Sequence, residues 1–133
     1  MIENPSARRA VELRARSKAF AIRIVRLFRL LPRTEEARLI GRQVLRSGTS
    51  MAANYRAVCR SRSMAEFVSR MGIVIEESDE TVFWLELLVD TGIVRKEKMD
   101  SLIQEADELL RIFAASRHTA KSGVRNQSTN RKS

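Results

Sequence analysis

The sequence predicts an all-α protein that folds as an antiparallel up-down-up-down four-helix bundle. Breakers are scarce, with five Gly and two Pro in 133 residues, so little interrupts helix formation. Apolar side chains recur at three- and four-residue steps in four stretches. The links between these stretches are short, which places consecutive helices side by side and antiparallel. We expect one domain over residues 1–118 and a disordered, basic tail over 119–133, which is too polar to bury a core.

The first predicted helix spans about residues 6–31. Pro5 and Ser6 are start signals, and Pro32 ends the helix because the residue before a proline resists the α conformation. Its apolar stripe comprises Leu13, Phe20, Ile24, Leu27, Phe28 and Leu31.

The second predicted helix starts after Thr34, its N-cap, and ends near residues 59–62. Glu35 and Glu36 occupy the first turn, where the helix dipole favours negative charge. One face is apolar and mostly small: Ala37, Gly41, Leu45, Gly48, Ala52, Tyr55 and Cys59. A second line, about 100° around the helix, carries the arginines Arg38, Arg42, Arg46, Arg56 and Arg60. A third face is short and polar, with Gln43, Ser47, Ser50 and Asn54, and we expect it to be packed as well.

The third and fourth helices have clear boundaries. Ser63 and Glu66 form an S-x-x-E capping box that starts the third helix, and Gly92 closes it. Its core stripe is Phe67, Met71, Val74, Ser78, Thr81, Leu85 and Leu88. The fourth helix is predicted over about 95–117, with a core line of Met99, Leu102, Ile103, Ala106, Leu109, Leu110 and Phe113.

The third helix has a second apolar patch on nearly the opposite side from its core stripe. The patch and the acidic residues within it are Ile73, Glu76, Glu80, Phe83, Trp84 and Leu87. A monomeric bundle needs only one apolar face on each helix, so this excess predicts a subunit interface in a homo-oligomer. In the alternative interpretation, Trp84 flanks the core and the other residues are scattered on the surface.

Charge is distributed unevenly along the chain. Residues 1–63 carry 15 Lys and Arg against 4 Asp and Glu, residues 64–115 carry 5 against 12, and residues 116–133 carry 5 against none. The positive surplus favours a polyanion, and the arginine line Arg38, Arg42, Arg46, Arg56 and Arg60 is the predicted RNA or DNA contact. No RRM or KH motif is present, so we expect weakly sequence-specific binding to the backbone. The alternative is that these arginines pair with the acidic third helix.

No catalytic, metal or cofactor site is predicted. The one histidine, His118, stands at the end of the fourth helix, so the Glu-x-x-His pairs of di-iron bundles are absent. Ser47, Thr49 and Ser50 have no histidine nearby in sequence and suit close helix crossings. The single cysteine, Cys59, excludes an intrachain disulfide. No secretory signal or membrane-spanning stretch is evident, so we expect a cytoplasmic protein.

Three segments stand out by their order and content: QVLRSGTSMAANYR over residues 43–56, RSMAEF over 62–67 and EESDETVFWLELL over 76–88. Together they resemble the four helix bundle protein family, also called the 23S rRNA intervening-sequence protein family. The resemblance spans about residues 15–115. It implies a ring-like homopentamer, a relation to the accessory protein of diversity-generating retroelements, which binds nucleic acid and its reverse transcriptase, and no catalytic residue. One position departs from the family pattern, which has Glu where this chain has Ala57.

These observations predict a non-enzymatic, homo-oligomeric protein that binds nucleic acid or serves a ribonucleoprotein through its basic surface. Its expected partners are further copies of itself, RNA or DNA, and a reverse transcriptase or another protein. A protein-interaction scaffold with no nucleic-acid role is the alternative, and a metal-dependent enzyme in the bundle core is the third hypothesis.

Overall fold

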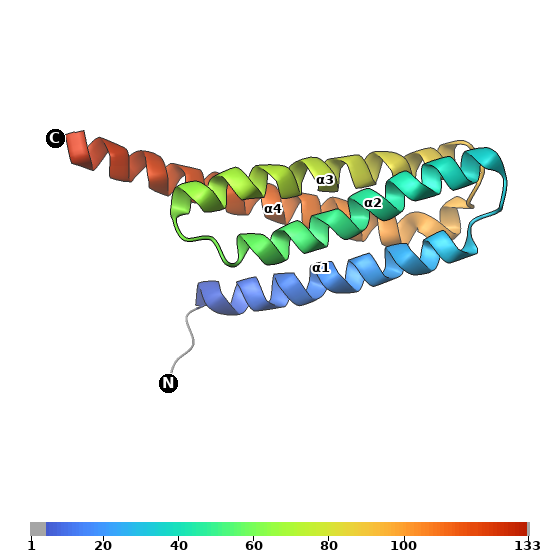
Figure 1. The fold of residues 1–133 in the computed structure, drawn as a ribbon, viewed down its shortest axis with the longest axis horizontal. Coiled ribbons are helices and arrows are strands. Elements are labelled where there is room, and N and C mark those ends of the chain that lie inside the picture. Colours follow the sequence, from blue (N-terminus) through green and yellow to red (C-terminus); the bar gives the residue numbers. More distant parts are fainter. Residues whose placement is uncertain (1–4, 133) are drawn as a thin grey trace.

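The computed structural model describes residues 5–132, and side chains are described for residues 6–126. Four helices fill that span: α1 (Pro5–Leu30), α2 (Glu35–Val58), α3 (Met64–Asp90) and α4 (Lys96–Lys132). Figure 1 shows them packed side by side, with the chain reversing direction at each of three short connections. No strand occurs within residues 5–132, which confirms the all-α prediction.

The helix ends follow the capping signals in the sequence. The side chain of Thr34 accepts a hydrogen bond from the backbone N–H of Ala37, and that of Ser63 accepts one from Glu66. Only half of the predicted capping box forms, because the Glu66 carboxylate pairs with Arg70 at 2.7 Å. Gly92 adopts φ +76°, the left-handed conformation that terminates a helix at low cost in glycine.

Two glycines on α2 allow α1 to approach closely. A Cβ at Gly41 would lie 2.6 Å from Leu31 Cδ1, and one at Gly48 would lie 2.9 Å from Ile24 Cγ1. Real Cβ atoms hardly ever approach another atom this closely, so a side chain at either position would force its neighbour to shift, which the flexible end of Leu31 can do more easily than Ile24. The small face of α2 is therefore the face that contacts α1.

The centre of the bundle contains α2 residues outside the predicted small face. Buried together with that face are Ile40, Val44, Met51 and Val58. The predicted stripes of the other helices supply Phe20, Ile24, Met71, Val74, Leu85, Leu88, Met99, Leu102, Leu109 and Phe113. Sequence reasoning selected one narrow apolar line on α2, whereas a helix with a neighbour on each side buries a wider arc.

One buried polar contact joins α2 to α3. The Thr81 hydroxyl donates to Ser47 Oγ at 2.9 Å, and Ser47 donates to the Gln43 carbonyl at 2.9 Å. Both side chains are almost completely buried. Because a buried polar group needs a partner, this pair favours one register between the two helices.

The predicted end of the fourth helix was wrong, because α4 continues past Arg117 to Lys132. The expected disordered tail over residues 119–133 therefore differs from the structure over 119–132. Ala120 is buried, so apolar contact extends one turn beyond Arg117. The following Lys121 and Arg125 are good helix formers, and a single glycine at 123 costs only about 1 kcal/mol. Figure 1 shows this segment projecting beyond the other helices.

None of the helices has, within the described residues, an apolar stretch long enough to cross a bilayer.

Candidate nucleic-acid interface

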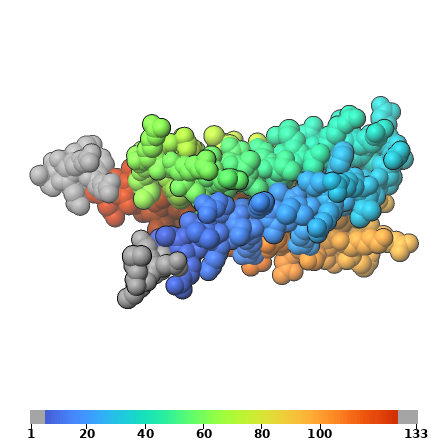
Figure 2. Space-filling view, turned by 60° about the horizontal axis from the view of Figure 1, so that its bottom comes forward, coloured from blue at the N-terminus to red at the C-terminus, as the bar shows by residue number. Residues whose placement is uncertain are grey.

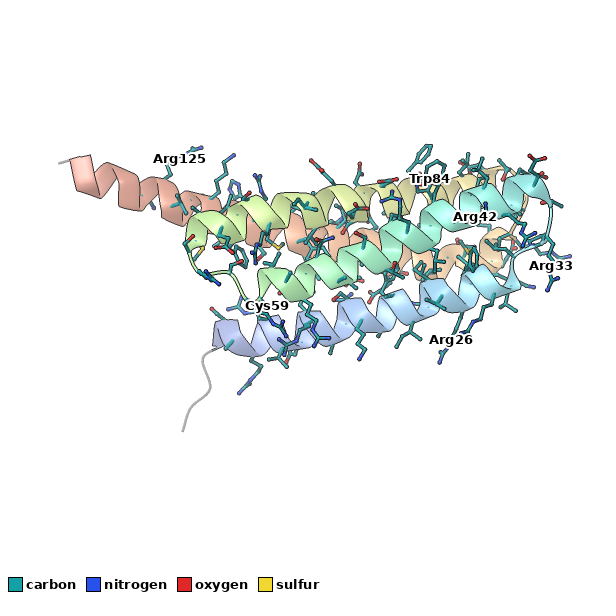
Figure 3. The ribbon with its side chains drawn as sticks, in the orientation of Figure 1. Arg26, Arg33, Arg42, Cys59, Trp84 and Arg125 are labelled. Atoms are coloured by element: carbon teal, nitrogen blue, oxygen red, sulfur yellow. The ribbon has the colours of Figure 1, made fainter. Side chains whose placement is uncertain are left out.

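All five arginines of the predicted line lie exposed along α2: Arg38, Arg42, Arg46, Arg56 and Arg60. Arg60 stands in the turn just after the helix, and the other four belong to α2 itself. The spacing of four residues from Arg38 to Arg42 to Arg46 keeps these three on one side of the helix. Figure 3 shows Arg42 on the outer surface of the bundle.

Arg46 is the member of this line that pairs with the acidic helix. Its guanidinium lies 3.3 Å from the Glu77 carboxylate and donates to the Glu80 carboxylate. The Trp84 indole N–H also donates to Glu80, at 3.1 Å. The bond from Arg46 is the main reason that the pKa of Glu80 lies below its ordinary value, and the same contact raises the pKa of Arg46.

The other four arginines make no side-chain hydrogen bond or ion pair to any residue that the structure describes. The two readings of the sequence therefore apply to different residues. Arg46 neutralises acidic groups of α3 within the same chain, whereas Arg38, Arg42, Arg56 and Arg60 keep their charges available to an external anion.

The unpaired arginines divide between the two ends of the bundle. Arg56 and Arg60 lie at the end where α1 begins, because α1 and α2 run in opposite directions (Figure 1). Arg9 and Arg14 on α1 are exposed at this end, and Arg14 is close enough to act electrostatically on Tyr55. With Arg62 in the following turn, these residues form a surface that we call the basic end: Arg9, Arg14, Arg56, Arg60 and Arg62.

The predicted oligomer interface is partly core and partly surface. Ile73 and Phe83 are 48% and 55% exposed, and Glu76 is exposed beside them. Trp84 and Leu87 pack partly against the core. The rings of Phe83 and Trp84 meet edge to face, with centroids 4.9 Å apart. We call the surface formed by Ile73, Glu76, Glu80, Phe83, Trp84 and Leu87 the α3 ridge.

An ion pair that sequence reasoning missed joins α1 to α4. Arg16 binds Glu105 through two hydrogen bonds of 2.9 and 2.6 Å and lies 3.2 Å from Glu108. The hydrogen bond to Glu105 is the largest reason that the pKa of Arg16 is raised. Nothing in the sequence relates Arg16 to Glu105, because they are 89 positions apart.

The hydroxyls considered as nucleophiles are engaged within their own helix. Thr49 donates to the Leu45 carbonyl at 2.6 Å, and Ser47 donates to Gln43. Asn54 donates to the Ser50 carbonyl at 2.8 Å and to its hydroxyl at 3.0 Å. No cluster of metal-ligating side chains occurs among the residues with described positions. This polar face of α2 therefore supports helix packing.

Two further positions bear on the sequence expectations. The pKa of the Tyr55 hydroxyl is raised, chiefly by burial and to a smaller extent by the neighbouring Cys59. Cys59 is half-buried and free. Ala57, which departs from the pattern that the resemblance implies, is exposed, and its backbone carbonyl accepts a hydrogen bond from Arg70 at 3.1 Å. Arg70 thus reaches the end of α2 without a carboxylate at position 57.

Comparison with known proteins supports the resemblance. Residues 9–115 match the family model described as 23S rRNA-intervening sequence protein. A solved structure of a protein with unknown function from the S23 ribosomal protein family of Bacteroides thetaiotaomicron VPI-5482 shares 31% sequence identity, with a TM-score of 0.76. That match covers 82% of this chain and 97% of the other. No curated protein sequence matches. The family model spans most of the chain, and the chain belongs to the 23S rRNA-intervening sequence protein family.

Proposed function

We propose that this protein is a non-enzymatic, homo-oligomeric nucleic-acid-binding protein that serves a ribonucleoprotein through its basic end. The observation that carries the proposal is the set of exposed arginines, on α2 and in the turn after it, that have no acidic partner among the described residues: Arg38, Arg42, Arg56 and Arg60. Guanidinium groups fit phosphate oxygens through paired N–H donors. A charged group without a protein partner is free to replace the counterions of a nucleic-acid backbone.

The basic end is the stronger of the two arginine groups. Its residues come from α1, α2 and the α2–α3 turn. A nucleic acid at this end could therefore contact arginines of more than one element. Among the residues with described side chains, α1 carries a single acidic residue, Glu12. At the opposite end, Arg38 follows Glu35 and Glu36 on the same helix. We therefore place the principal contact at Arg56 and Arg60 and a weaker contact at Arg38 and Arg42.

The family name supports RNA as the target, since it refers to sequences that intervene in 23S rRNA. The structural neighbour from the S23 ribosomal protein family points the same way. Assembly through the α3 ridge, as a pentamer by resemblance, would multiply a weak contact by avidity. A reverse transcriptase or another nucleic-acid enzyme is the protein partner that the retroelement relation suggests.

Fluorescence anisotropy with a labelled RNA hairpin and its single-stranded form tests this proposal. If each chain neutralises about four phosphates, affinity should fall by about 100-fold between 50 and 200 mM salt. Unrelated sequences of equal length should bind within a few-fold of each other, because backbone contacts carry no sequence information. Absence of binding at 50 mM salt would overturn the proposal.

Charge-reversal variants locate the contact. Arg56→Glu with Arg60→Glu should weaken RNA binding by at least tenfold and leave the helical circular dichroism unchanged. Lys96→Glu with Arg111→Glu is the matched control, because it makes the same charge change on exposed positions of α4. Equal loss in both variants would mean that only net charge matters, which contradicts a site at the basic end.

A protein-interaction scaffold is the second candidate, and the α3 ridge favours it. Phe83 is more than half exposed beside acidic residues, which suits a partner surface that is both apolar and basic. A stoichiometric partner recovered after nuclease treatment, combined with no RNA affinity of the purified protein, would support the scaffold over the nucleic-acid role.

The non-enzymatic assignment rests on how the reactive groups are used. The Ser47 and Thr49 hydroxyls donate to carbonyls of their own helix, and the Ser50 hydroxyl accepts a hydrogen bond from the Asn54 amide. A nucleophile needs an adjacent base that holds its proton, and none of these hydroxyls contacts a histidine or a carboxylate.

A further inference from the structure

A cavity of about 600 Å³ lies between the end of α1 and the start of α4. Figure 2 shows these two segments on one face of the molecule, at the end of the bundle away from the termini. The α1–α2 and α3–α4 connections contribute Pro32 and Gly92 to its wall. The volume falls within the range of cavities that hold a small molecule, about 300–1,000 Å³.

Among the described side chains, the hydrogen bonds and ion pairs between α1 and α4 come from Arg16 and Arg23 of α1. Arg16 binds Glu105. About two turns further along α1, the Arg23 guanidinium donates to the Ser101 hydroxyl at 3.1 Å. Beyond Arg23, no described side-chain hydrogen bond or ion pair joins the two helices. Arg23, the last of these α1 residues, is itself one of the residues that line the cavity.

The lining has an unusual composition for a gap between helices. Its floor is aliphatic, with Leu27, Leu31, Val94, Met99 and Leu102. Its four charged residues, Arg23, Arg26, Arg95 and Lys98, are all cationic. The lining contains neither an acidic nor an aromatic residue. Leu30, at 84% exposed, adds an apolar side chain at the rim.

The cations are available to a ligand. Arg26, Arg95 and Lys98 are exposed and make no described ion pair. Glu97 and Asp100 precede and follow Lys98 closely on α4, yet neither lines the cavity. Like charges gathered around an apolar floor repel one another, so an anion bound among them lowers the free energy of the site.

We propose that this cavity binds an amphipathic aliphatic anion, a carboxylate on a medium-length acyl chain. The chain would lie on the floor formed by Leu27, Val94 and Leu102, and the carboxylate would meet Arg26 and Lys98. A nucleotide fits less well, because the lining offers no aromatic ring on which a base could stack. The site lies at the opposite end of the bundle from the basic end, so the proposal stands independently of RNA binding.

Isothermal titration of the full-length protein with sodium decanoate, below its micelle concentration, tests the proposal. We expect saturable binding of one decanoate per chain. Octanoate should bind about 15-fold more weakly, because two buried methylenes are lost at about fourfold each. Decyltrimethylammonium, which has the same chain and the opposite charge, should bind at least tenfold more weakly than decanoate. No saturable binding, or equal binding of the cation, would overturn the proposal.

Two variants and a charge-matched control separate this site from general attraction. Arg26→Glu with Lys98→Glu should lower decanoate affinity at least tenfold, and Val94→Trp should abolish binding by filling the floor. Arg56→Glu with Arg60→Glu, at the other end of the molecule, should bind decanoate like the parent protein. Equal weakening by both charge variants would overturn the proposal.

Circular dichroism, light scattering and RNA affinity of the same variants complete the test. If Val94→Trp loses its helical circular dichroism, the Arg26 and Lys98 variant still decides the outcome. Two results together would show that a second copy of the chain covers the cavity. The parent protein would not bind decanoate, and the Arg26 and Lys98 variant would form a smaller oligomer by light scattering. The ligand proposal would then fail. RNA affinity of the Arg26 and Lys98 variant, measured in parallel, shows whether nucleic-acid binding fails separately.

Discussion

At the scale of single residues, the close approach of α1 and α2 depends on which atom faces each glycine. The Cβ of a substituted Gly41 would meet Leu31 Cδ1, the far end of a flexible side chain. A Cβ at Gly48 would meet both Ile24 Cγ1 at 2.9 Å and Cγ2 at 3.0 Å. Ile24 is β-branched and fully buried, so it has little freedom to move. Gly48 therefore constrains the packing more strongly than Gly41.

We predict that Gly48→Ala lowers the free energy of unfolding by about 1–2 kcal/mol, because the overpacking cost exceeds the gain in helix propensity. Gly72→Ala is the control, since its Cβ would make an ordinary contact 3.6 Å from Arg117 Nε. That change should raise the free energy by about 0.5–1 kcal/mol. Urea denaturation followed by circular dichroism measures both, and a stabilising Gly48→Ala would contradict the close contact.

A second residue-scale prediction concerns the Arg46–Glu80–Trp84 contact. The pKa of Glu80 is lowered chiefly by the hydrogen bond from Arg46. A depressed folded-state pKa contributes stability above the unfolded pKa and loses it as pH falls through the folded pKa. Trp84 is the only tryptophan, and its indole N–H donates to Glu80, so its fluorescence reports this protonation.

We predict an acid transition in Trp84 fluorescence with a midpoint below the ordinary value for glutamate, about 4.3. Arg46→Ala should move that midpoint upward, and Glu80→Gln should remove the transition. The stability lost at neutral pH in Glu80→Gln should be no more than about 0.5 kcal/mol, because both partners are partly exposed. Identical midpoints in the parent protein and Arg46→Ala would show that this ion pair does not form in solution.

At the scale of elements, α4 differs most from what its sequence suggests. Its first part carries an apolar line that packs in the core, and Ala120 is the last described residue to be buried. Past that residue the described side chains, up to Asn126, are exposed except that of Val124, which is half-buried. Exposed side chains bury little apolar area, so this segment should contribute little to the stability of the fold.

We predict that deleting residues 123–133 leaves the melting temperature of the protein within about 2 °C of the parent value, since a shift that small corresponds to well under 1 kcal/mol. The deletion removes Arg125, Arg131 and Lys132, so RNA affinity at low salt should fall. Deletion from residue 117 is the contrasting control, because it also removes the Arg117 hydrogen bond to the Val68 carbonyl and the buried Ala120. Equal melting temperatures for both deletions would contradict this division of α4.

At the scale of the whole molecule, basic charge and exposed apolar surface are concentrated on different helices. The exposed arginines of the basic end come from α1, α2 and the α2–α3 connection, whereas Ile73 and Phe83 are exposed on α3 among carboxylates. Among the described residues of the arginine line, Arg46 is the one that pairs with α3. A molecule with one basic surface and one apolar, acidic surface has separate places for a nucleic acid and for a protein neighbour.

We predict that the protein in solution has a mass that is a multiple of 15.2 kDa, a pentamer if the family resemblance extends to assembly. Phe83→Glu should yield a monomer that keeps its helical circular dichroism, because the side chain lies at the surface of the single chain. Val11→Glu on α1 is the matched control, since Val11 is 54% exposed, and it should not change the mass. Multi-angle light scattering measures all three, and a monomeric parent protein would contradict an interface on the α3 ridge.

The sequence by itself determined the elements of this fold. Helix ends at Thr34, Ser63 and Gly92 follow from capping chemistry that acts within a few residues. The apolar stripes of α1, α3 and α4 follow from periodicity along one helix. Periodicity does not predict the central residues of α2, which are Ile40, Val44, Met51 and Val58. Their burial depends on neighbours on both sides of the helix. The extension of α4 lies beyond the predicted helix, because the low apolar content of residues 119–133 is typical of a disordered tail.

Only the tertiary structure decided which charges remain available. Arg46 and Arg42 are one turn apart and equivalent in sequence, yet Arg46 reaches Glu77 and Glu80, whereas Arg42 makes no side-chain contact with an acidic group. The bond from Arg16 to Glu105 and the cavity near Arg23 are likewise set by the tertiary structure. These features depend on the rotation and separation of whole helices, which packing of side chains far apart in sequence sets. Periodicity within one helix determines its faces, and packing between helices determines what each face meets.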